Sequence, residues 1–133
     1  MAEPQTSSAP FAATCCGAGP KLIFACSGAA DVGKISDLAA RKLTAEGAGK
    51  MFCLAGIGGR VSGILASTEA AQAILAIDGC PLDCAKKTLE NAAFGRFEHV
   101  RLSDLGLEKG KTPVTDEAVD AVVAEGRRRL AAV

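Results

Sequence analysis

Four cysteines of this chain stand at positions where their thiols could act together. Cys26 and Cys53 lie at or near the ends of short apolar runs, and Cys80 directly follows a third such run. Twenty-seven residues separate each of these cysteines from the next, and Cys84 lies four residues beyond Cys80. Four thiolates are a donor set that zinc prefers and that also holds iron–sulfur clusters. These residues predict a metal site if the fold brings them to one place.

The elements that must position the cysteines alternate between strand and helix. Short apolar runs predict strands over 22–26, 51–55 and 73–77, with a shorter one over 98–102. Helical spacing and capping residues predict helices over 31–46, within 60–72, over 81–91 and after Thr115. This order favours an α/β fold, a three-layer sandwich with a mostly parallel four-stranded sheet and helices on both faces.

In such a sheet the carboxyl ends of the strands share one edge, and ligands bind there. Cys26, Cys53 and Cys80 are all expected at this edge. Pro81 suits the first position of a helix, which would place Cys80 at the N-cap and Cys84 one turn later on the same side. A helix N-terminus favours thiolates, so this pair strengthens the prediction.

Other polar residues near the cysteines have two readings each. Asp78 could orient a metal ligand or accept an N–H beside it, or it could simply be the first residue of an Asp-Gly turn. Ser27, with Gly28, could bring backbone N–H groups toward the thiolates, although tight turns explain such residues equally well. His99 is the single histidine. It is expected on a strand away from the cysteine loops, as a structural or surface residue.

Residues 1–19 are rich in Ala, Ser, Pro and Thr and are expected to form a flexible arm, followed by one metal-binding domain over 20–133. The arm carries the adjacent pair Cys15 and Cys16. Exposed adjacent thiols attract oxidants and soft metals, so this pair could deliver or capture a metal or metalloid. It could equally be an incidental pair with no role.

Composition excludes several classes of function. The chain has 133 residues, 15 basic and 15 acidic side chains, five Phe, no Trp and no Tyr. A neutral chain without a stacking platform is not expected to bind nucleic acid. No apolar stretch is long enough to span a membrane, and no secretory signal precedes the first strand. We therefore expect a cytoplasmic protein, where thiols stay reduced and a disulfide framework is not expected.

Three strings of residues carry a family resemblance. They are Ala-Cys-Ser-Gly-Ala-Ala-Asp-Val-Gly at 25–33, Cys-Leu-Ala-Gly-Ile-Gly-Gly at 53–59, and Ala-Ile-Asp-Gly-Cys-Pro-Leu-Asp-Cys-Ala-Lys-Lys at 76–87. Their order and spacing resemble the DGC-domain family of small bacterial zinc-binding proteins, named for the motif found here as Asp78-Gly79-Cys80. The likeness covers most of residues 21–130. It implies zinc on Cys26, Cys53, Cys80 and Cys84, and it implies no established catalytic activity.

Three functional hypotheses follow. The first is a four-cysteine zinc site, structural or holding cargo, which has no open position for hydrolytic catalysis. The second is a thiol centre for redox or metalloid handling, using Cys80 or Cys84 and the pair Cys15 and Cys16. The third is a metal-stabilised interaction module without chemistry of its own. The sequence indicates no particular protein partner.

Overall fold

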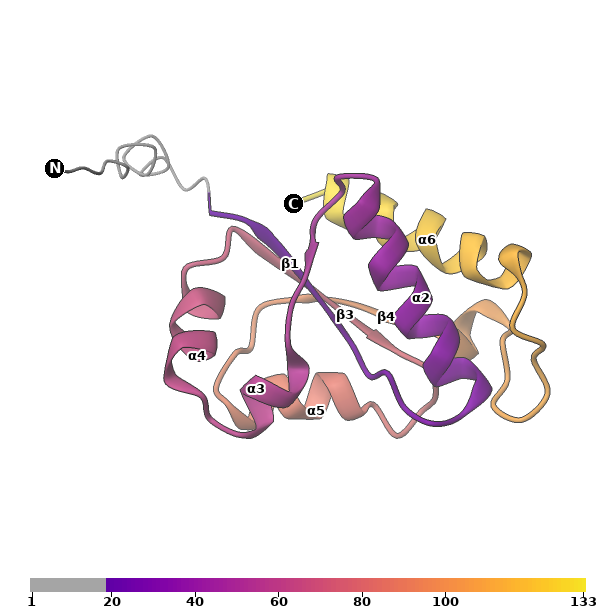
Figure 1. Ribbon diagram of the computed structural model, residues 1–133, viewed down its shortest axis with the longest axis horizontal. Coiled ribbons are helices and arrows are strands. Elements are labelled where there is room, and N and C mark those ends of the chain that lie inside the picture. Colours follow the sequence, from indigo (N-terminus) through magenta and orange to yellow (C-terminus); the bar gives the residue numbers. More distant parts are fainter. Residues whose placement is uncertain (1–18) are drawn as a thin grey trace, which may run out of the picture.

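The fold is an α/β sandwich, seen in a computed structural model that describes residues 19–133 (Figure 1). Its sheet is parallel throughout, with the strand order β2-β1-β3-β4. The elements, in chain order, are β1 (Lys21–Ala25), α2 (Asp31–Ala45), β2 (Lys50–Met51), α3 (Leu54–Gly58), α4 (Ser62–Glu69), β3 (Ala73–Asp78), α5 (Cys84–Asn91), β4 (Glu98–Arg101), the 3-10 helix η3 (Leu102–Leu105) and α6 (Asp116–Ala131).

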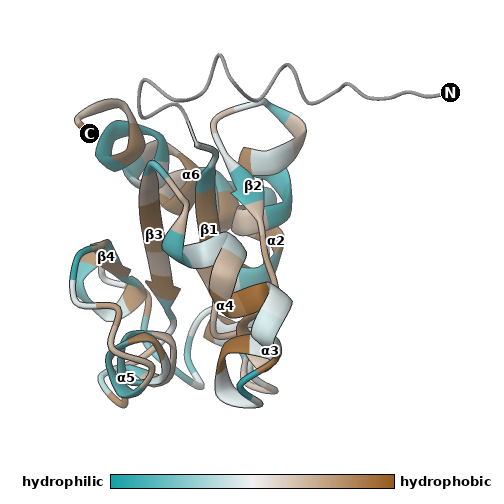
Figure 2. Ribbon diagram, turned by 90° about the vertical axis from the view of Figure 1, so that its left-hand side faces the viewer, coloured by the Kyte–Doolittle hydropathy of each residue, from teal (hydrophilic) through white to brown (hydrophobic). Residues whose placement is uncertain are grey.

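Alternation along the two central strands builds the three predicted layers. Ile23 and Leu75 pack with α2 and α6 on one face of the sheet, and Phe24 and Ala76 pack with α3 and α5 on the other. Both faces of β1 and β3 are buried, which is why these strands are apolar along most of their length in Figure 2. The expected fold class is confirmed.

The two long helices begin and end where local chemistry predicts. Thr115 precedes α6, and its hydroxyl accepts the Ala118 amide at 3.2 Å, which satisfies one of the free N–H groups of the first turn. Helix α2 is followed by Gly47, whose φ of 81° lies in the left-handed region that ends many helices. None of the helices formed by residues 19–133 is long and apolar enough to cross a bilayer.

Asp31, the first residue of α2, also holds the loop before α6. Its carboxylate accepts the amides of Gly110 at 2.9 Å, Thr112 at 3.1 Å and Val32 at 2.8 Å. Hydrogen bonds from the Gly110 and Thr112 amides are the main reason that the pKa of Asp31 lies below its ordinary value of 3.8. The loop is therefore fixed to α2 by an ionised carboxylate.

We expect acid to loosen this attachment. Because the pKa of Asp31 is lower in the folded chain than in the unfolded chain, its contribution to stability is present above the ordinary value of 3.8 and is lost as the pH falls through the folded value. Urea unfolding at about pH 6 and about pH 3 measures the loss. The Asp31→Asn variant should lose less stability between these two pH values than the wild type. An equal loss would contradict the assignment.

Candidate functional site

Cys26 directly follows β1 at the carboxyl edge of the sheet. Its amide donates to the carbonyl of Ile77 at 3.0 Å, and its half-buried side chain packs against the apolar cluster on the α3 and α5 face. Ser27 then turns the chain with a φ of 51°, a left-handed conformation that is strained for a residue other than glycine. The Ser27 hydroxyl donates to Asp37 of α2 at 2.8 Å, which holds this turn in place.

Cys53 lies outside the strand that the sequence predicts over 51–55. Strand β2 ends at Met51, and Cys53 is instead the N-cap of the short helix α3. Its Sγ accepts the amide of Gly56 at 3.3 Å, so the thiol takes the place that a Ser or Asp oxygen usually takes at a helix start. The residue is exposed. Of the predicted strand only Met51 lies in β2, although the cysteine does follow a strand.

Helix α5 begins at Cys84, three residues later than predicted. The cause is Asp83, whose φ of 55° cannot belong to a right-handed helix. Pro81 is thus not the first helical residue, and Cys80 is not the N-cap. Cys80 lies instead in a turn that closes when the Asp83 amide donates to the Cys80 carbonyl at 3.1 Å. The Cys80 side chain is half-buried, and Cys84 is exposed on the first residue of α5.

The four predicted ligands share the carboxyl edge of the sheet but do not form a closed cluster. All four are free thiols. Cys80 packs against the cluster on the α2 and α6 face, and Cys26 against the cluster on the opposite face. Within residues 19–133, no three cysteine sulfurs lie within 4.8 Å of one another. The thiols are therefore carried on neighbouring loops that stand apart in this conformation.

Two of the four cysteines line one cavity. It has a volume of about 810 Å³, and both Cys26 and Cys53 line it, together with apolar side chains that include Met51 and Leu54. Asp37 and Arg41 lie at the same cavity and pair with each other at 2.7 Å. The Arg41 guanidinium, with the Ser27 hydroxyl, lowers the pKa of Asp37. The cavity therefore places two of the predicted ligands beside a charged pair.

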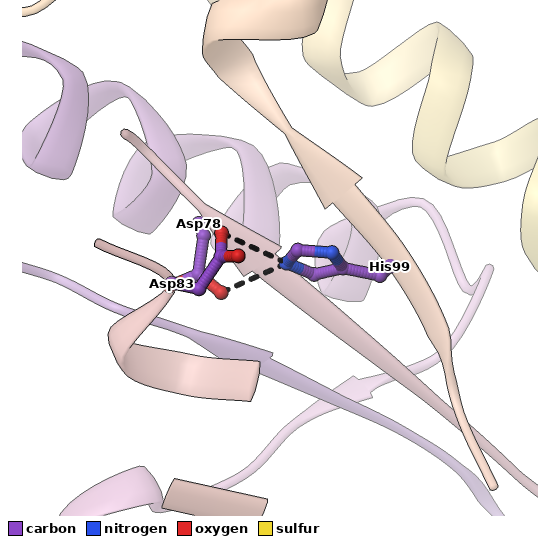
Figure 3. A group of neighbouring side chains, drawn as sticks. All are labelled: Asp78, Asp83 and His99. Carbon is purple, nitrogen blue, oxygen red and sulfur yellow. Dashed lines mark hydrogen bonds and ion pairs between the residues drawn. The ribbon is translucent and has the colours of Figure 1, made fainter. Parts of the chain in front are cut away.

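A group of polar side chains next to these loops was not predicted from the sequence. It consists of Asp78, Asp83 and His99 (Figure 3). Nε2 of His99 lies 2.9 Å from Oδ2 of Asp78 and 3.8 Å from Oδ1 of Asp83. His99 does lie on a strand, as predicted, but the prediction that it lies away from the cysteine loops is wrong. Strand β4 pairs with β3, and this pairing places His99 beside the Asp78-Gly79-Cys80 segment.

Asp78 is the best buried member of this group, with 1% of its surface exposed. Its Oδ1 accepts the amide of Ala85 at 2.7 Å, and its Oδ2 accepts the amide of Lys86 at 3.0 Å. The carboxylate therefore caps the first turn of α5, where free N–H groups and the helix dipole favour a negative charge. The role that the structure shows for Asp78 is thus a structural one, the cap of α5.

Two glycines, one in the segment 25–33 and one in the segment 76–87, allow the cysteine loops to pack closely against α2. A Cβ on Gly33 would lie 2.4 Å from the carbonyl oxygen of Gly28 in the Cys26 loop. A Cβ on Gly79 would lie 2.8 Å from Cγ2 of Val32. Both contacts are too close for any side chain. These glycines therefore bring the residues that follow Cys26 and precede Cys80 against the first turns of one helix.

A small parallel α/β domain with free thiols on the loops at its carboxyl edge is the class of protein that the fold and site define. The chain belongs to the DGC-domain family, whose match covers residues 22–125. It is similar to the anaerobic and virulence modulator AnvM of Pseudomonas aeruginosa, with 36% identity over 88 residues, which are 66% of this chain and 67% of that protein. No solved structure matches the chain significantly. Cys15 and Cys16 lie outside the described residues.

Proposed function

We propose that this protein binds one zinc ion through Cys26, Cys53, Cys80 and Cys84. The observation that carries the proposal is the placement of four free thiols at one edge of the sheet, three on loops and Cys84 at the start of α5. Their donor chemistry suits zinc, and it would equally suit an iron–sulfur cluster. A cytoplasmic location, in which thiols stay reduced, fits this role.

The loops would have to close around the ion. Sulfurs that bind zinc tetrahedrally at about 2.3 Å from the metal lie about 3.8 Å from one another. No three sulfurs approach that spacing in the described residues. Cys26 and Cys53 follow β1 and β2, Cys80 lies in the turn before α5, and Cys84 is the first residue of α5, so no strand carries a thiol. The movement would therefore involve the loops and the start of α5 and would leave the sheet intact.

The metal is proposed as exchangeable rather than as a condition for folding. Each face of the sheet has its own buried apolar cluster, and no buried side-chain polar atom of residues 19–133 lacks a hydrogen-bond partner. Such a chain has a core without metal, unlike a zinc finger. Cys53 and Cys84 are exposed, so a bound ion would be open to competing ligands. Bound zinc would still add stability by mass action.

Metal analysis of protein purified without oxygen tests the proposal. We expect about one zinc per chain, and close to none in the double variant Cys80→Ser, Cys84→Ser, because two thiolates hold zinc far more weakly than four. The variant Cys15→Ser, Cys16→Ser is the matched control and should keep its zinc. Circular dichroism of each variant verifies that the chain is folded. If the protein instead contains iron and sulfide and absorbs visible light, the group bound by these cysteines is an iron–sulfur cluster and not zinc.

A thiol centre for redox or metalloid handling is the second candidate. The separation of the sulfurs favours it, because thiols that act one at a time need no closed cluster. Cys26 and Cys53 in the shared cavity and Cys84 on the surface are all within reach of a small reactant. Metal-free protein from an anaerobic preparation, together with rapid alkylation of Cys80 or Cys84, would favour this candidate over the zinc site.

The name of the Pseudomonas relative describes a modulator. We extend that reading to this chain and expect no catalytic activity from the closed four-thiolate site, which leaves no free position on the metal. Leu82, between Cys80 and Cys84, has 59% of its surface exposed and would lie at any contact that a partner makes with these cysteines.

A further inference from the structure

The turn that carries Cys80 and Cys84 is held from one side by strand β4. His99 and Arg101 alternate with the buried Val100, so both side chains point to the α5 face of the sheet. The register of β3 and β4 sets Ala76 beside His99 and Asp78 beside Arg101. The two side chains thus reach Asp78 and Asp83. These aspartates lie on either side of Cys80 in the sequence, and Asp83 directly precedes Cys84.

His99 acts on Asp78. Both oxygens of Asp78 already accept amide hydrogens from the first turn of α5, so His99 completes the set by donating through Nε2 at 2.9 Å. Figure 3 shows the imidazole of β4 pointing at the carboxylate of Asp78. The end of β3, the start of α5 and β4 therefore meet at one buried carboxylate.

Arg101 acts on Asp83. Its Nε and Nη2 donate to the two carboxylate oxygens of Asp83 at 2.8 and 2.6 Å, a two-pronged contact that fixes the orientation of both groups. The guanidinium lowers the pKa of Asp83 and keeps this carboxylate charged. Asp83 has the strained left-handed backbone immediately before Cys84. Arg101 thus stabilises the conformation that decides where α5 begins.

Strand β4 is itself braced from the other layer. Nη1 of Arg129 in α6 donates to the carbonyl of His99 at 3.1 Å, and its Nε contacts Glu125 at 2.9 Å. The side chains that hold the turn therefore rest on a fixed strand and not on a loop.

The group is not a cation site in its own right. The Asp78 oxygens accept three N–H donors, and the Asp83 oxygens are taken by a guanidinium. A cation would have to displace Arg101 and would remove the cap from α5. The group therefore has a structural role, in which it holds the turn.

We propose that His99 and Arg101 are positioning residues that hold the Cys80–Cys84 turn in place, through Asp78 and Asp83, before any metal arrives. The purpose of this arrangement rests on the proposed metal site, but the arrangement itself concerns the metal-free protein. Residues that orient metal ligands typically change affinity by about 10- to 100-fold when they are replaced. We therefore expect the network to act on both the reactivity of the thiols and the binding of zinc.

Competitive alkylation of the metal-free protein tests the proposal. Iodoacetamide labelling is followed at each cysteine by mass spectrometry, and the rate at Cys80 is divided by the rate at Cys26 in the same molecule. Both thiols are half-buried, so Cys26 is an internal reference. We expect the ratio to rise several-fold in His99→Ala and in Arg101→Gln, because the freed turn exposes Cys80. His99→Gln, whose amide can still donate to Asp78, should restore most of the wild-type ratio.

Two matched controls separate positioning from a general loss of stability. Asp104→Asn removes the outer and longer contact of Arg101, at 3.4 Å, and leaves Asp83 paired. Asp120→Asn removes an exposed ion pair between α6 and α2, with Lys42 at 2.5 Å. Neither should change the ratio. An unchanged ratio in folded His99→Ala and Arg101→Gln would overturn the proposal.

Zinc titration against a chelator then separates this inference from the proposed function. If the wild type binds zinc and His99→Ala and Arg101→Gln bind it tenfold more weakly, the zinc site and the positioning role are both supported. Wild type that binds no zinc refutes the proposed function alone, since the labelling ratio still decides whether the turn is held. Equal zinc affinity in wild type and variants, with an altered labelling ratio, would limit the network to the metal-free state and overturn its role in metal binding.

Discussion

The Gly33→Ala variant is expected to be less stable than the wild type by about 3 kcal/mol, even though alanine is the better helix former. In an exposed helix interior this change stabilises by about 1 kcal/mol. Here the added Cβ would lie 2.4 Å from the Gly28 carbonyl oxygen and 2.7 Å from the Gly28 carbonyl carbon and amide nitrogen. These are backbone atoms, so no side-chain rotation relieves the clash, and the Cys26 loop has to move.

Gly28→Ala is the matched control, because a Cβ at that position has no atom within 4 Å. Urea unfolding gives the difference in stability of each variant, provided that the slope of the transition is unchanged. Zinc binding should weaken in Gly33→Ala and stay at the wild-type level in Gly28→Ala, since only the first displaces the loop of a proposed ligand. Equal stability of the two variants would contradict the packing described here.

The largest loss of stability is expected from Phe24→Ala, about 3–5 kcal/mol. Phe24 is fully buried in the middle of β1, and its ring meets that of Phe52 edge to face at 6.1 Å between centroids. Truncation leaves a cavity under the α3 and α5 layer and removes the aromatic pair, which is worth about 1 kcal/mol beyond its buried area.

Phe24→Leu, which keeps most of the volume, should cost clearly less than Phe24→Ala when the two are compared by thermal or urea unfolding. Phe52 directly precedes Cys53. The ratio of the labelling rate at Cys53 to that at Cys84 should therefore be higher in Phe24→Ala than in the wild type. A cost below about 1 kcal/mol for Phe24→Ala would mean that the layers can collapse onto the cavity.

The fold could be predicted from the sequence because its two central strands, β1 and β3, are buried on both faces. Runs such as Ala73 to Ile77 are continuously apolar, and a turn residue or a glycine follows them. Residues such as Gly47 and Thr115 fixed helix boundaries through local backbone chemistry, which a single sequence contains. Parallel pairing then followed from the alternation of strand and helix.

The details at the site depended on contacts between distant residues. Nothing near Pro81 in the sequence indicates that Asp83 takes a left-handed conformation, because Arg101 of β4 holds it there. Likewise, β2 ends before Cys53 because the thiol caps α3. His99 could be placed on a strand, but its neighbour Asp78 could be recognised only from the order of β3 and β4 in the sheet.

The layer formed by α2 and α6 also bears on how the chain is made. Val119, Val122 and Leu130 of α6 cover the same sheet face as α2. A ribosome adds about 5–20 residues per second, so the strands are complete a few seconds before residues 116–131 emerge. A sheet that forms in that interval would have one apolar face only half covered, the kind of surface that aggregates or recruits chaperones. Packing of α6 is thus the step that completes the cover of this face.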